Sequence, residues 1–275
     1  VDFDQKPETV NISVGAIILT PGFEEFDARL KSEYGYGRYP NVVSSIEFER
    51  IMNAYGPFGG KVLRPSDGKI PRKAAFIQCV GSRSERNGRS YCSNVCCMNT
   101  IKDSLLIKEH WPETEIYVFY VDIRAYGKGF EDLYKRARKE GVIFIRGLPA
   151  EILEDRKTRS LWLVGENTLK NELYKKNADM VILSIGLEPR KDNEIIQRLL
   201  TLSRTQDGFF MEAHPKLRPV DAATGGIFFA GCAEAPKDIK DSVTQASAAA
   251  ARAGILMAKG TVTVAAITAT SYRDN

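Results

Sequence analysis

The feature of this sequence that most constrains its fold is an alternation of short apolar runs with helix-like segments in the central part of the chain. Lys73–Val80, Glu115–Ile123 and Val142–Arg146 are runs of strand length, rich in β-branched and aromatic residues. Between them, Cys92–His110 carries apolar residues at helical spacing, and Gly129–Glu140 predicts a second helix. This order of strand, helix, strand, helix and strand predicts a parallel α/β sheet with crossover helices.

Further elements are expected on either side of this region. Helices are expected at Ile46–Asn53, where Ser44 or Ser45 would supply the cap, and at Asp241–Lys259. Strands are expected, in chain order, at Asn11–Leu19, Ala150–Val164 (an antiparallel pair), Ala178–Ile185 and Gly226–Gly231. A chain of 275 residues is more naturally two domains than one.

Four of the five cysteines are crowded into one short stretch: Cys79, Cys92, Cys96 and Cys97, with Cys232 far from them in sequence. Thiolates gathered in this way hold iron–sulfur clusters or structural zinc. Their gaps of 13, 4 and 1 positions match neither paired C-x-x-C zinc knuckles nor the ferredoxin run C-x-x-C-x-x-C. The pattern favours an iron–sulfur cluster over zinc, and four cysteines without a ligand are the alternative.

The adjacent pair Cys96–Cys97 predicts where the helix of this region begins. Neighbouring side chains diverge by about 100° on a regular helix, so the two sulfurs can converge only in its first turn. At that end the positive helix dipole favours thiolates and an anionic cluster. Cys79, at the end of the preceding strand, would approach the same helix end, where a dinucleotide fold holds a phosphate.

A second constellation lies near the C-terminal end of the sequence. A short strand leads to Gly231 and then to a helix rich in small residues, Ala246–Ala251, which permits close packing. The helix N-terminus near Asp241–Thr244 could donate N–H groups to a carbonyl or phosphate of a cofactor. A well-packed alanine-rich helix is the alternative. No G-x-G-x-x-G motif follows any of the expected strands.

Composition limits the classes of partner. The net charge of +4 arises from 39 basic and 35 acidic residues that are mixed along the chain, so no nucleic-acid partner is expected. No apolar run approaches the roughly 20 residues that span a bilayer, so no membrane insertion is expected. Clustered cysteines and the absence of a secretory leader predict a cytoplasmic protein. Because Val1 opens the sequence without a methionine, a piece of a longer polypeptide is expected.

Together these stretches resemble the flavoprotein family of the heterodisulfide reductase A subunit, with its relatives in quinone-interacting membrane-bound oxidoreductases. The motifs that carry the resemblance are Q-C-V-G-S-R (78–83), Y-C-S-N-V-C-C-M-N-T-I-K (91–102), F-Y-V-D-I-R-A-Y-G-K-G-F-E (119–131), G-V-I-F-I-R-G (141–147), D-G-F-F-M-E-A-H-P-K-L-R-P-V-D (207–221) and G-I-F-F-A-G-C-A-E-A-P-K-D-I (226–239). The resemblance implies a thioredoxin-reductase-like α/β architecture, in which a split FAD-type domain (1–71 and 187–262) surrounds an inserted Rossmann-like iron–sulfur domain (72–186) and a tail (263–275) follows.

The resemblance also implies site residues. The metal ligands of a [4Fe–4S] cluster would be Cys79, Cys92, Cys96 and Cys97. Residues near FAD would be Thr20 and Gly22 of the motif T-P-G-F, then Gly231, Cys232, Val243, Thr244 and Gln245. Cys232 stands where related flavin reductases have an aspartate. The family's glycine fingerprint for the FAD phosphates would precede Val1, so FAD binding by this chain is expected to be weak or lost.

The function implied is that of an oxidoreductase subunit that passes electrons between FAD and a [4Fe–4S] cluster, with other subunits of a heterodisulfide-reductase-like complex as partners. Taken alone, the chain is expected to be inactive. Lys102, just beyond the cysteines, is a candidate catalytic cation facing a reduced flavin, and a solvated surface lysine is its alternative. Two other functions remain open, an NAD(P)-dependent flavin disulfide reductase and a zinc-stabilised scaffold subunit.

Overall fold

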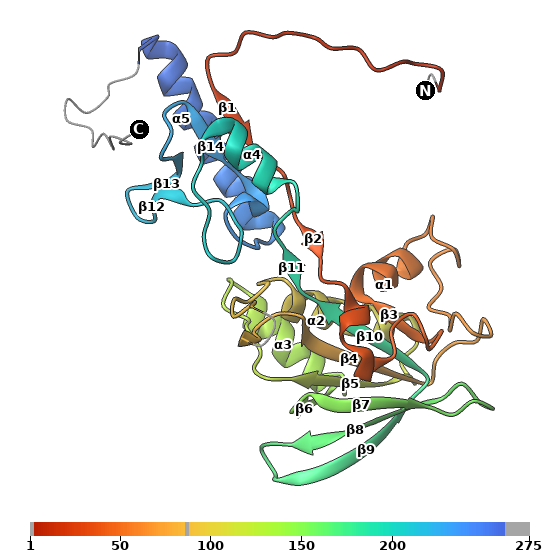
Figure 1. Ribbon diagram of the computed structural model, residues 1–275. Helices are drawn as coiled ribbons and strands as arrows, with labels where there is room; N and C mark the ends of the chain where they lie inside the picture. The colour runs from red at the N-terminus through yellow and green to blue at the C-terminus, as the bar shows by residue number, and fades with distance from the viewer. Residues whose placement is uncertain (1–2, 86–87, 262–275) are drawn as a thin grey trace, which may run out of the picture. The chain divides into compact units, whose positions relative to one another are not determined.

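The computed structural model describes residues 3–85 and 88–261, and the chain divides into two compact units (Figure 1). Unit 1 combines residues 1–22, 189–235 and those from 239 onward, whereas unit 2 comprises Phe23–Glu188 and Pro236–Asp238. Unit 1 is therefore built from segments on both sides of unit 2 in the sequence.

Unit 2 is built on a five-stranded sheet in which every pairing is parallel. The order across the sheet is β3 (Val42–Ser44), β10 (Met180–Ile185), β4 (Lys73–Val80), β5 (Glu115–Tyr120) and β6 (Ile143–Arg146). The crossover helices are α2 (Cys96–His110) and α3 (Phe130–Lys139), and α1 (Ser45–Met52) follows β3. The predicted alternation of strands and helices is confirmed, because the apolar runs pair and the helices cross between them.

The two faces of this sheet are covered differently (Figure 1). On one face, Phe76 and Val118 share a core with residues of α1, α2 and α3, including Phe48 and Ile101. The other face packs against the 26–34 segment and a three-stranded antiparallel sheet, β7 (Pro149–Glu154), β8 (Leu161–Asn167) and β9 (Glu172–Ala178). This sheet contains the expected antiparallel pair, extended by β9.

Unit 1 is a smaller sheet of β1 (Ile17–Leu19), β14 (Ile227–Phe229), β13 (Arg218–Ala222) and β12 (Glu212–His214). The first two strands are parallel and the others antiparallel. Helix α5 (Ile239–Lys259) buries Ala249 and Ala253 against this sheet, and α4 (Asn193–Leu200) adds to a second core. The strand expected from Asn11 begins only at Ile17, since Ile12 and Val14 are exposed without a paired strand.

The division into units differs from the domain boundary expected at residue 72. Residues 23–71 belong to unit 2, because β3 pairs with β10 in the central sheet and Phe26 and Tyr34 lie in its core. A short antiparallel pair, β2 (Glu24–Glu25) with β11 (Leu187–Glu188), lies where the chain enters and leaves unit 2. The expected tail 263–275 lies outside the described residues.

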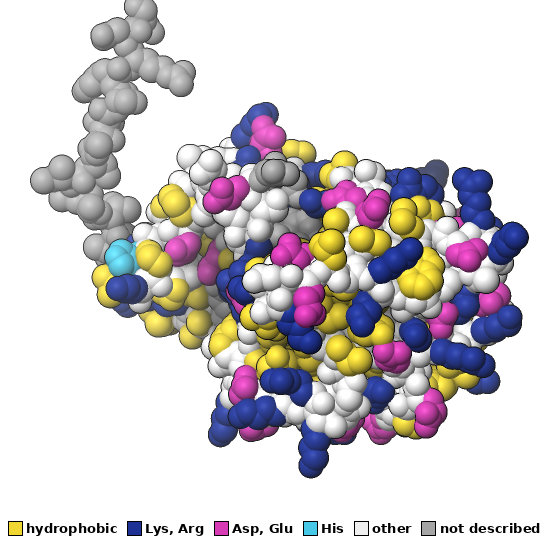
Figure 2. All heavy atoms as spheres, turned by 90° about the horizontal axis from the view of Figure 1, so that it is seen from below, with side chains coloured by type: hydrophobic (Ala, Val, Ile, Leu, Met, Phe, Trp, Pro, Cys, Tyr) yellow, Lys and Arg dark blue, Asp and Glu magenta, His cyan; other side chains and the backbone are white. Residues whose placement is uncertain are grey.

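The surface carries charges of both signs. In Figure 2 the basic and acidic side chains are interspersed over the visible face. In the part of the chain that the structure describes, we find no helix with both the length and the apolar character needed to cross a bilayer.

Candidate functional site: a cysteine centre and a backbone cradle

The four clustered cysteines lie where three neighbouring strands of the unit 2 sheet end. Cys79 is the next-to-last residue of β4. The Cys96 thiol faces the carbonyl oxygen of Ile185 at the end of β10, with 3.8 Å between sulfur and oxygen. The Cys97 thiol lies 3.9 Å from the carbonyl oxygen of Asp122, just beyond β5. The carboxyl edge of a parallel sheet is the usual ligand-binding edge.

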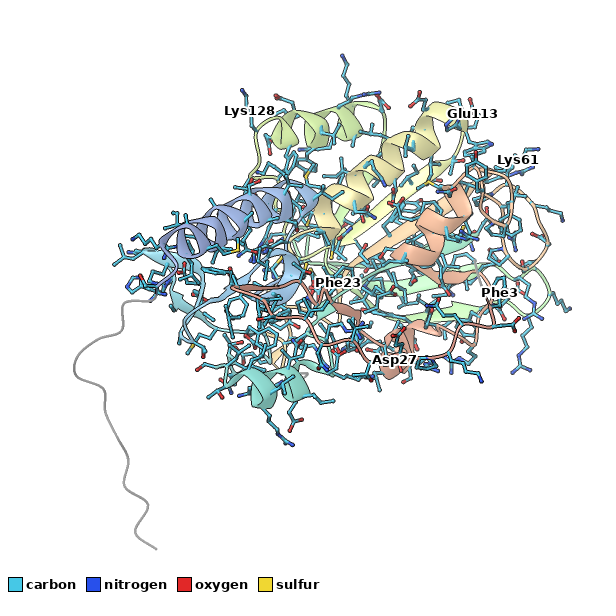
Figure 3. All side chains as sticks on the ribbon, turned by 90° about the horizontal axis from the view of Figure 1, so that it is seen from above. Phe3, Phe23, Asp27, Lys61, Glu113 and Lys128 are labelled. Carbon is cyan, nitrogen blue, oxygen red and sulfur yellow. The ribbon has the colours of Figure 1, made fainter. Side chains whose placement is uncertain are left out.

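Helix α2 begins at Cys96, as the adjacency of the two cysteines predicted. Val95 precedes it and offers no side-chain acceptor, so no cap satisfies the first N–H groups of α2. Figure 3 shows the length of α2, with Glu113 beyond its far end, so the cysteines occupy the N-terminal end. The positive end of the helix dipole therefore points toward the sulfurs.

The backbone around the cysteines is held in unusual conformations. Cys79, Arg83 and Asn94 have φ values of 58°, 55° and 61°, in the left-handed region that non-glycine residues seldom adopt. They are three of the six such residues in the described part of the chain. Conformations of this kind cost free energy and gather at functional sites, where the surrounding structure holds them in place.

The loop that carries Cys92 is tied to the end of the sheet by its polar neighbours. The buried Ser93 hydroxyl oxygen accepts a hydrogen bond from Leu187 N at 2.9 Å, and the Tyr91 hydroxyl donates to Leu187 O at 3.0 Å. Asn94 donates through its side chain to Pro236 O at 3.1 Å and through its backbone to Cys92 Sγ at 3.3 Å. Sequence reasoning missed these anchors, because a serine or asparagine beside a cysteine looks like any polar loop residue.

The four thiols lie near enough to one another to influence each other's ionisation. Burial raises the pKa of Cys79 to about 11, and the neighbouring Cys97 and Cys92 add to this rise. The pKa of Cys96 is raised by burial first, and then by charges on each of the other three thiols. Burial also raises the pKa of Cys97, although a hydrogen bond from the Arg124 backbone partly lowers it. The sequence-predicted ligands are therefore brought together.

Arg83 supplies a positive charge beside this centre. Its guanidinium binds Asp122 through two hydrogen bonds of 2.7 and 2.9 Å, and it also lowers the pKa of Cys79 against the effect of burial. The bond to Asp122 raises the pKa of Arg83 and lowers that of Asp122, although burial opposes both shifts. The Arg83 side chain is only 20% exposed, so its charge acts close to the sulfurs.

The described cysteines do not converge as the ligands of one metal ion would. A single zinc ion needs sulfurs about 2.3 Å from one point, hence about 3.8 Å apart in a tetrahedron. Among the described residues, no three His, Cys, Asp or Glu side chains converge in a way that could hold one ion. A cluster binds each thiolate through a separate iron, so its ligands stand further apart.

Four candidate flavin residues follow the carboxyl ends of β1 and β14, namely Thr20, Gly22, Gly231 and Cys232. These strands are parallel neighbours, and Ala230 N donates to Leu19 O at 3.1 Å. Thr20 and Gly231 follow the two strands directly. Gly22 and Gly231 have φ values of +77° and +65°, and a Cβ at either would meet nothing within 4 Å, so open space lies over both turns. Cys232 is buried beside Gly231.

Helix α5 lies close to these turns in the sequence, and its start differs from the expected one. The helix begins at Ile239, two residues before the expected Asp241, so its unpaired N–H groups lie before Val243. The backbone of Val243, Thr244 and Gln245 is inside the helix and cannot donate to a cofactor in the expected way. The Gln245 side chain donates to Glu234 at 2.7 Å, and its buried Oε1 has no hydrogen-bond partner.

The turns that follow β1 and β14 leave room for part of a cofactor. Two open glycine turns and the unpartnered Gln245 oxygen fit a planar, polar ring system approaching the backbone. The sequence contains no G-x-G-x-x-G for a pyrophosphate. The residues present therefore fit the ring portion of FAD and not its phosphates.

Lys102 makes contacts within unit 2. Its ammonium is paired with Glu49 of α1 and lies 3.0 Å from Asp103 Oδ1. Burial alone would lower the pKa of Lys102, but these two carboxylates outweigh it and raise the pKa. The lysine ties α1 to α2, and its role beside a flavin stays a prediction.

No protein-family model matches the chain. The second form of the CoB–CoM heterodisulfide reductase iron-sulfur A subunit in Methanopyrus kandleri is 55% identical over 265 residues, which cover 96% of this chain and 40% of that protein. The chain is homologous to the heterodisulfide reductase A subunit. The corresponding polypeptide of the H2:CoB–CoM heterodisulfide, ferredoxin reductase of Methanothermobacter thermautotrophicus is 51% identical over 100% of this chain and 42% of that protein. The chain thus spans about two fifths of these curated relatives.

Solved structures agree on the fold. The chain is similar to the thioredoxin reductase of Lactococcus lactis, with a TM-score of 0.55 and 17% identity over 89% of this chain and 66% of that one. It is also similar to T. acidophilum thioredoxin reductase, with a TM-score of 0.52 and 12% identity over 89% of this chain and 65% of the other. The predicted thioredoxin-reductase-like architecture is confirmed, and at these identities the likeness concerns the fold alone.

Proposed function

We propose that this chain is the electron-transfer core of an oxidoreductase subunit in a heterodisulfide-reductase-like complex. In this proposal Cys79, Cys92, Cys96 and Cys97 hold a [4Fe–4S] cluster, and FAD lies against the β1–β14 cradle. The observation that carries it is the gathering of four coupled thiols around the uncapped N-terminus of α2. A 55% identical relative is named as an iron-sulfur subunit, which supports it.

When bound, an iron–sulfur cluster exchanges single electrons and a flavin exchanges pairs. The chain's own residues bind, orient and shield these groups. Cys96 and Cys97 present their sulfurs from the first turn of α2, where the helix dipole offsets negative charge. The Arg83 guanidinium adds a second positive charge, and the burial of Cys96 and Cys97 keeps water away from them.

Two other functions compete with this one. A zinc-stabilised scaffold subunit would use the same cysteines without redox chemistry. An NAD(P)-dependent flavin disulfide reductase would need a nucleotide site in unit 2, where the cysteines stand at the phosphate position. The proposed partners are other subunits of the complex. The proposed location is the cytoplasm.

Iron and acid-labile sulfide analysis of the chain, reconstituted without oxygen, tests the proposal. We expect about four iron and four sulfide per chain and a broad charge-transfer absorbance that reduction bleaches. Serine at Cys96 or Cys97 should abolish iron binding and lower the melting temperature of unit 2, because metal binding contributes folding free energy. The matched control is Cys232→Ser, which removes the one cysteine outside the centre and should keep its iron.

Stoichiometric zinc without iron would refute the cluster and favour the scaffold function. Retention of full iron content by Cys96→Ser would remove that residue from the ligand set. Binding of added FAD, followed by quenching of its fluorescence, tests the flavin part separately. We expect weak binding, because the pyrophosphate lacks a glycine-rich helix N-terminus.

A further inference from the structure

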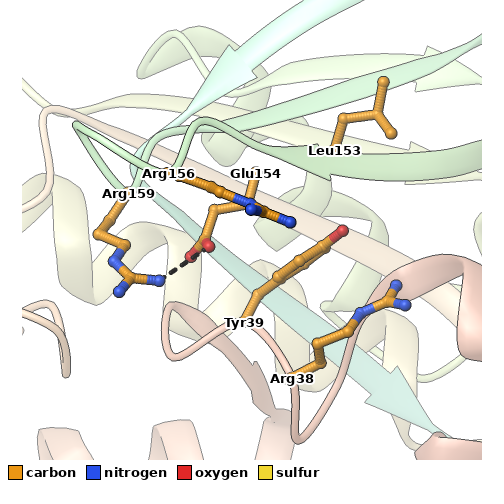
Figure 4. Close-up of a pocket in the computed structure, with 6 residues that line it drawn as sticks. All are labelled: Arg38, Tyr39, Leu153, Glu154, Arg156 and Arg159. Carbon is orange, nitrogen blue, oxygen red and sulfur yellow. Dashed lines mark hydrogen bonds and ion pairs between the residues drawn. The ribbon is translucent and has the colours of Figure 1, made fainter.

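A pocket of about 450 Å³ lies in unit 2, on elements that do not carry the cysteines. It is formed by the loop before β3 and by the β7–β8 hairpin. Its lining residues are Arg38, Tyr39, Leu153, Glu154, Arg156 and Arg159 (Figure 4). Its volume falls within the roughly 300–1,000 Å³ of typical small-molecule sites. Neither the cluster nor the flavin proposal uses these side chains.

The wall of this pocket is held in place by buried polar groups. The fully buried Asn41 donates to Arg159 O at 3.0 Å, and Arg64, itself 9% exposed, donates to Thr158 O at 2.9 Å. Arg159 has a φ of 57°, a left-handed conformation that these bonds fix. Two separate buried side chains thus clamp the tip of the hairpin against the loop, so the pocket is preformed.

The pocket carries more positive than negative charge. The pocket holds three guanidiniums and one carboxylate, that of Glu154. Of the three arginines that line it, only Arg159 pairs with this carboxylate, with 3.0 Å between nitrogen and oxygen. Arg38 lies 4.7 Å from the centre of the Tyr39 ring and donates to Ser32 O. In the described part of the chain, the Arg156 guanidinium has no hydrogen bond or ion pair. The charges of Arg38 and Arg156 are therefore available to an anion.

Glu154 gives the pocket a second chemical character. Its side chain is 6% exposed, and Oε2 accepts from Arg159. Its other oxygen, Oε1, is buried without a hydrogen-bond partner. In Figure 4 the carboxylate lies between Arg159 and Tyr39, within the pocket. A buried carboxylate oxygen without a donor is costly, and a hydroxyl group of a ligand would satisfy it.

We propose that this pocket binds a small phosphate ester that carries free hydroxyl groups. The phosphate lies on Arg156 and on the Arg38 donors that Ser32 O leaves free, and the planar guanidinium suits phosphate oxygens. A hydroxyl group donates to Glu154 Oε1, as carboxylates do when they bind a ribose. The apolar Leu153 side chain and the Tyr39 ring border the carbon skeleton.

Calorimetric titration of the full chain with ribose 5-phosphate, inorganic phosphate and ribose tests this assignment. We expect ribose 5-phosphate to bind most tightly, phosphate more weakly and ribose not measurably. Arg156→Ala should weaken both phosphate-bearing probes by about tenfold or more, since charge-assisted hydrogen bonds are lost. Glu154→Gln should reduce the preference for ribose 5-phosphate over phosphate. The matched control is Lys157→Ala, which removes the adjacent cation that does not line the pocket.

Three results would overturn the proposal. They are the absence of saturable binding of ribose 5-phosphate by the wild-type chain, equal losses in Lys157→Ala and Arg156→Ala, and an unchanged preference in Glu154→Gln. Binding of polyglutamate without binding of ribose 5-phosphate would also overturn it and identify a docking surface for an acidic protein. Circular dichroism melting of each variant, with an unchanged midpoint expected for Arg156→Ala, separates lost binding from lost folding.

Discussion

Replacing Asp103 with asparagine tests the electrostatics of the helix that carries the cysteines. The Asp103 side chain is 1% exposed, and its carboxylate accepts from Asn99 at 3.0 Å and lies 3.0 Å from Lys102 Nζ. Burial, and then the charge of Glu49, raises the pKa of Asp103 from 3.8 to about 7 against the effect of Lys102. The folded state therefore holds this proton more tightly than the unfolded chain does.

The sign and size of the effect follow from this pKa difference. Because the folded pKa lies above the unfolded one, stability falls as pH rises between the two values. A difference of about 3 units corresponds to ~4 kcal/mol, of which roughly 2–3 kcal/mol is lost between pH 5 and pH 8. Asparagine keeps an oxygen for Asn99 and carries no charge. As pH rises from 5 to 8, the free energy of unfolding of Asp103→Asn should therefore increase by roughly 2–3 kcal/mol relative to that of the wild type.

Urea unfolding followed by tryptophan fluorescence measures this difference in unit 2. Both tryptophans of the chain lie there, Trp111 at the end of α2 and Trp162 in β8. The matched control is Asp132→Asn, an exposed carboxylate on α3, whose stability should follow the wild type from pH 5 to pH 8. If the unfolding free energies of Asp103→Asn and the wild type run parallel across this range, Asp103 does not change its protonation there and the reasoning fails.

Two further substitutions test other parts of the fold. Arg252→Ala removes a guanidinium that lies 2.8 Å from buried Asp221. The free energy of unfolding of unit 1 at pH 7, measured by thermal circular dichroism, should fall by about 2 kcal/mol. Although burial would raise the pKa of Asp221, its arginine partners hold it below the usual value, so this loss should vanish as pH falls below about 4. Gly81→Ala should destabilise unit 2 and reduce iron uptake, because its φ is +85° and a Cβ would lie 2.1 Å from the Phe26 ring. Gly88→Ala, at φ +64° with open space around it, should keep its iron, and equal losses in both would contradict the steric argument.

The sequence predicted those elements whose pattern is local. β4 has the predicted bounds, because its apolar run pairs on both sides with other strands of the sheet. α1 begins at Ser45, where the Ser44 hydroxyl and the Glu47 carboxylate form a reciprocal cap. The start of α2 followed from geometry alone, since adjacent cysteines can share one ligand only in a first turn. In each case, the information lies within a few neighbouring residues.

The sequence did not predict elements that depend on distant partners. β9 is largely polar and exposed, and it is a strand because β8 supplies its hydrogen bonds. β2 and β11 are two residues each and carry no pattern of their own. The expected boundary at residue 72 differs from the division into units for the same reason, since the pairing of β3 with β10 joins residues more than a hundred positions apart. The pocket of Arg38 and Glu154 likewise joins segments that no spacing connects.

The sequence predicted the candidate ligands, whose role stays a prediction, but it did not predict the residues that hold their loop. The four cysteines can be recognised in the sequence by residue type and spacing. Tyr91, Ser93 and Asn94 instead act through hydrogen bonds to Leu187 and Pro236, which are visible only in the folded chain.

The start of α2 distinguishes cluster binding from NAD(P) binding in unit 2. A nucleotide-dependent reductase needs the helix N-terminus after a central strand for its pyrophosphate. In this chain that position is the start of α2, where Cys96 and Cys97 are buried against the carbonyl oxygens of Ile185 and Asp122. A phosphate there would have to displace both sulfurs from the helix end. The same positive dipole cannot serve two anions, so cluster binding and NAD(P) binding exclude each other in unit 2.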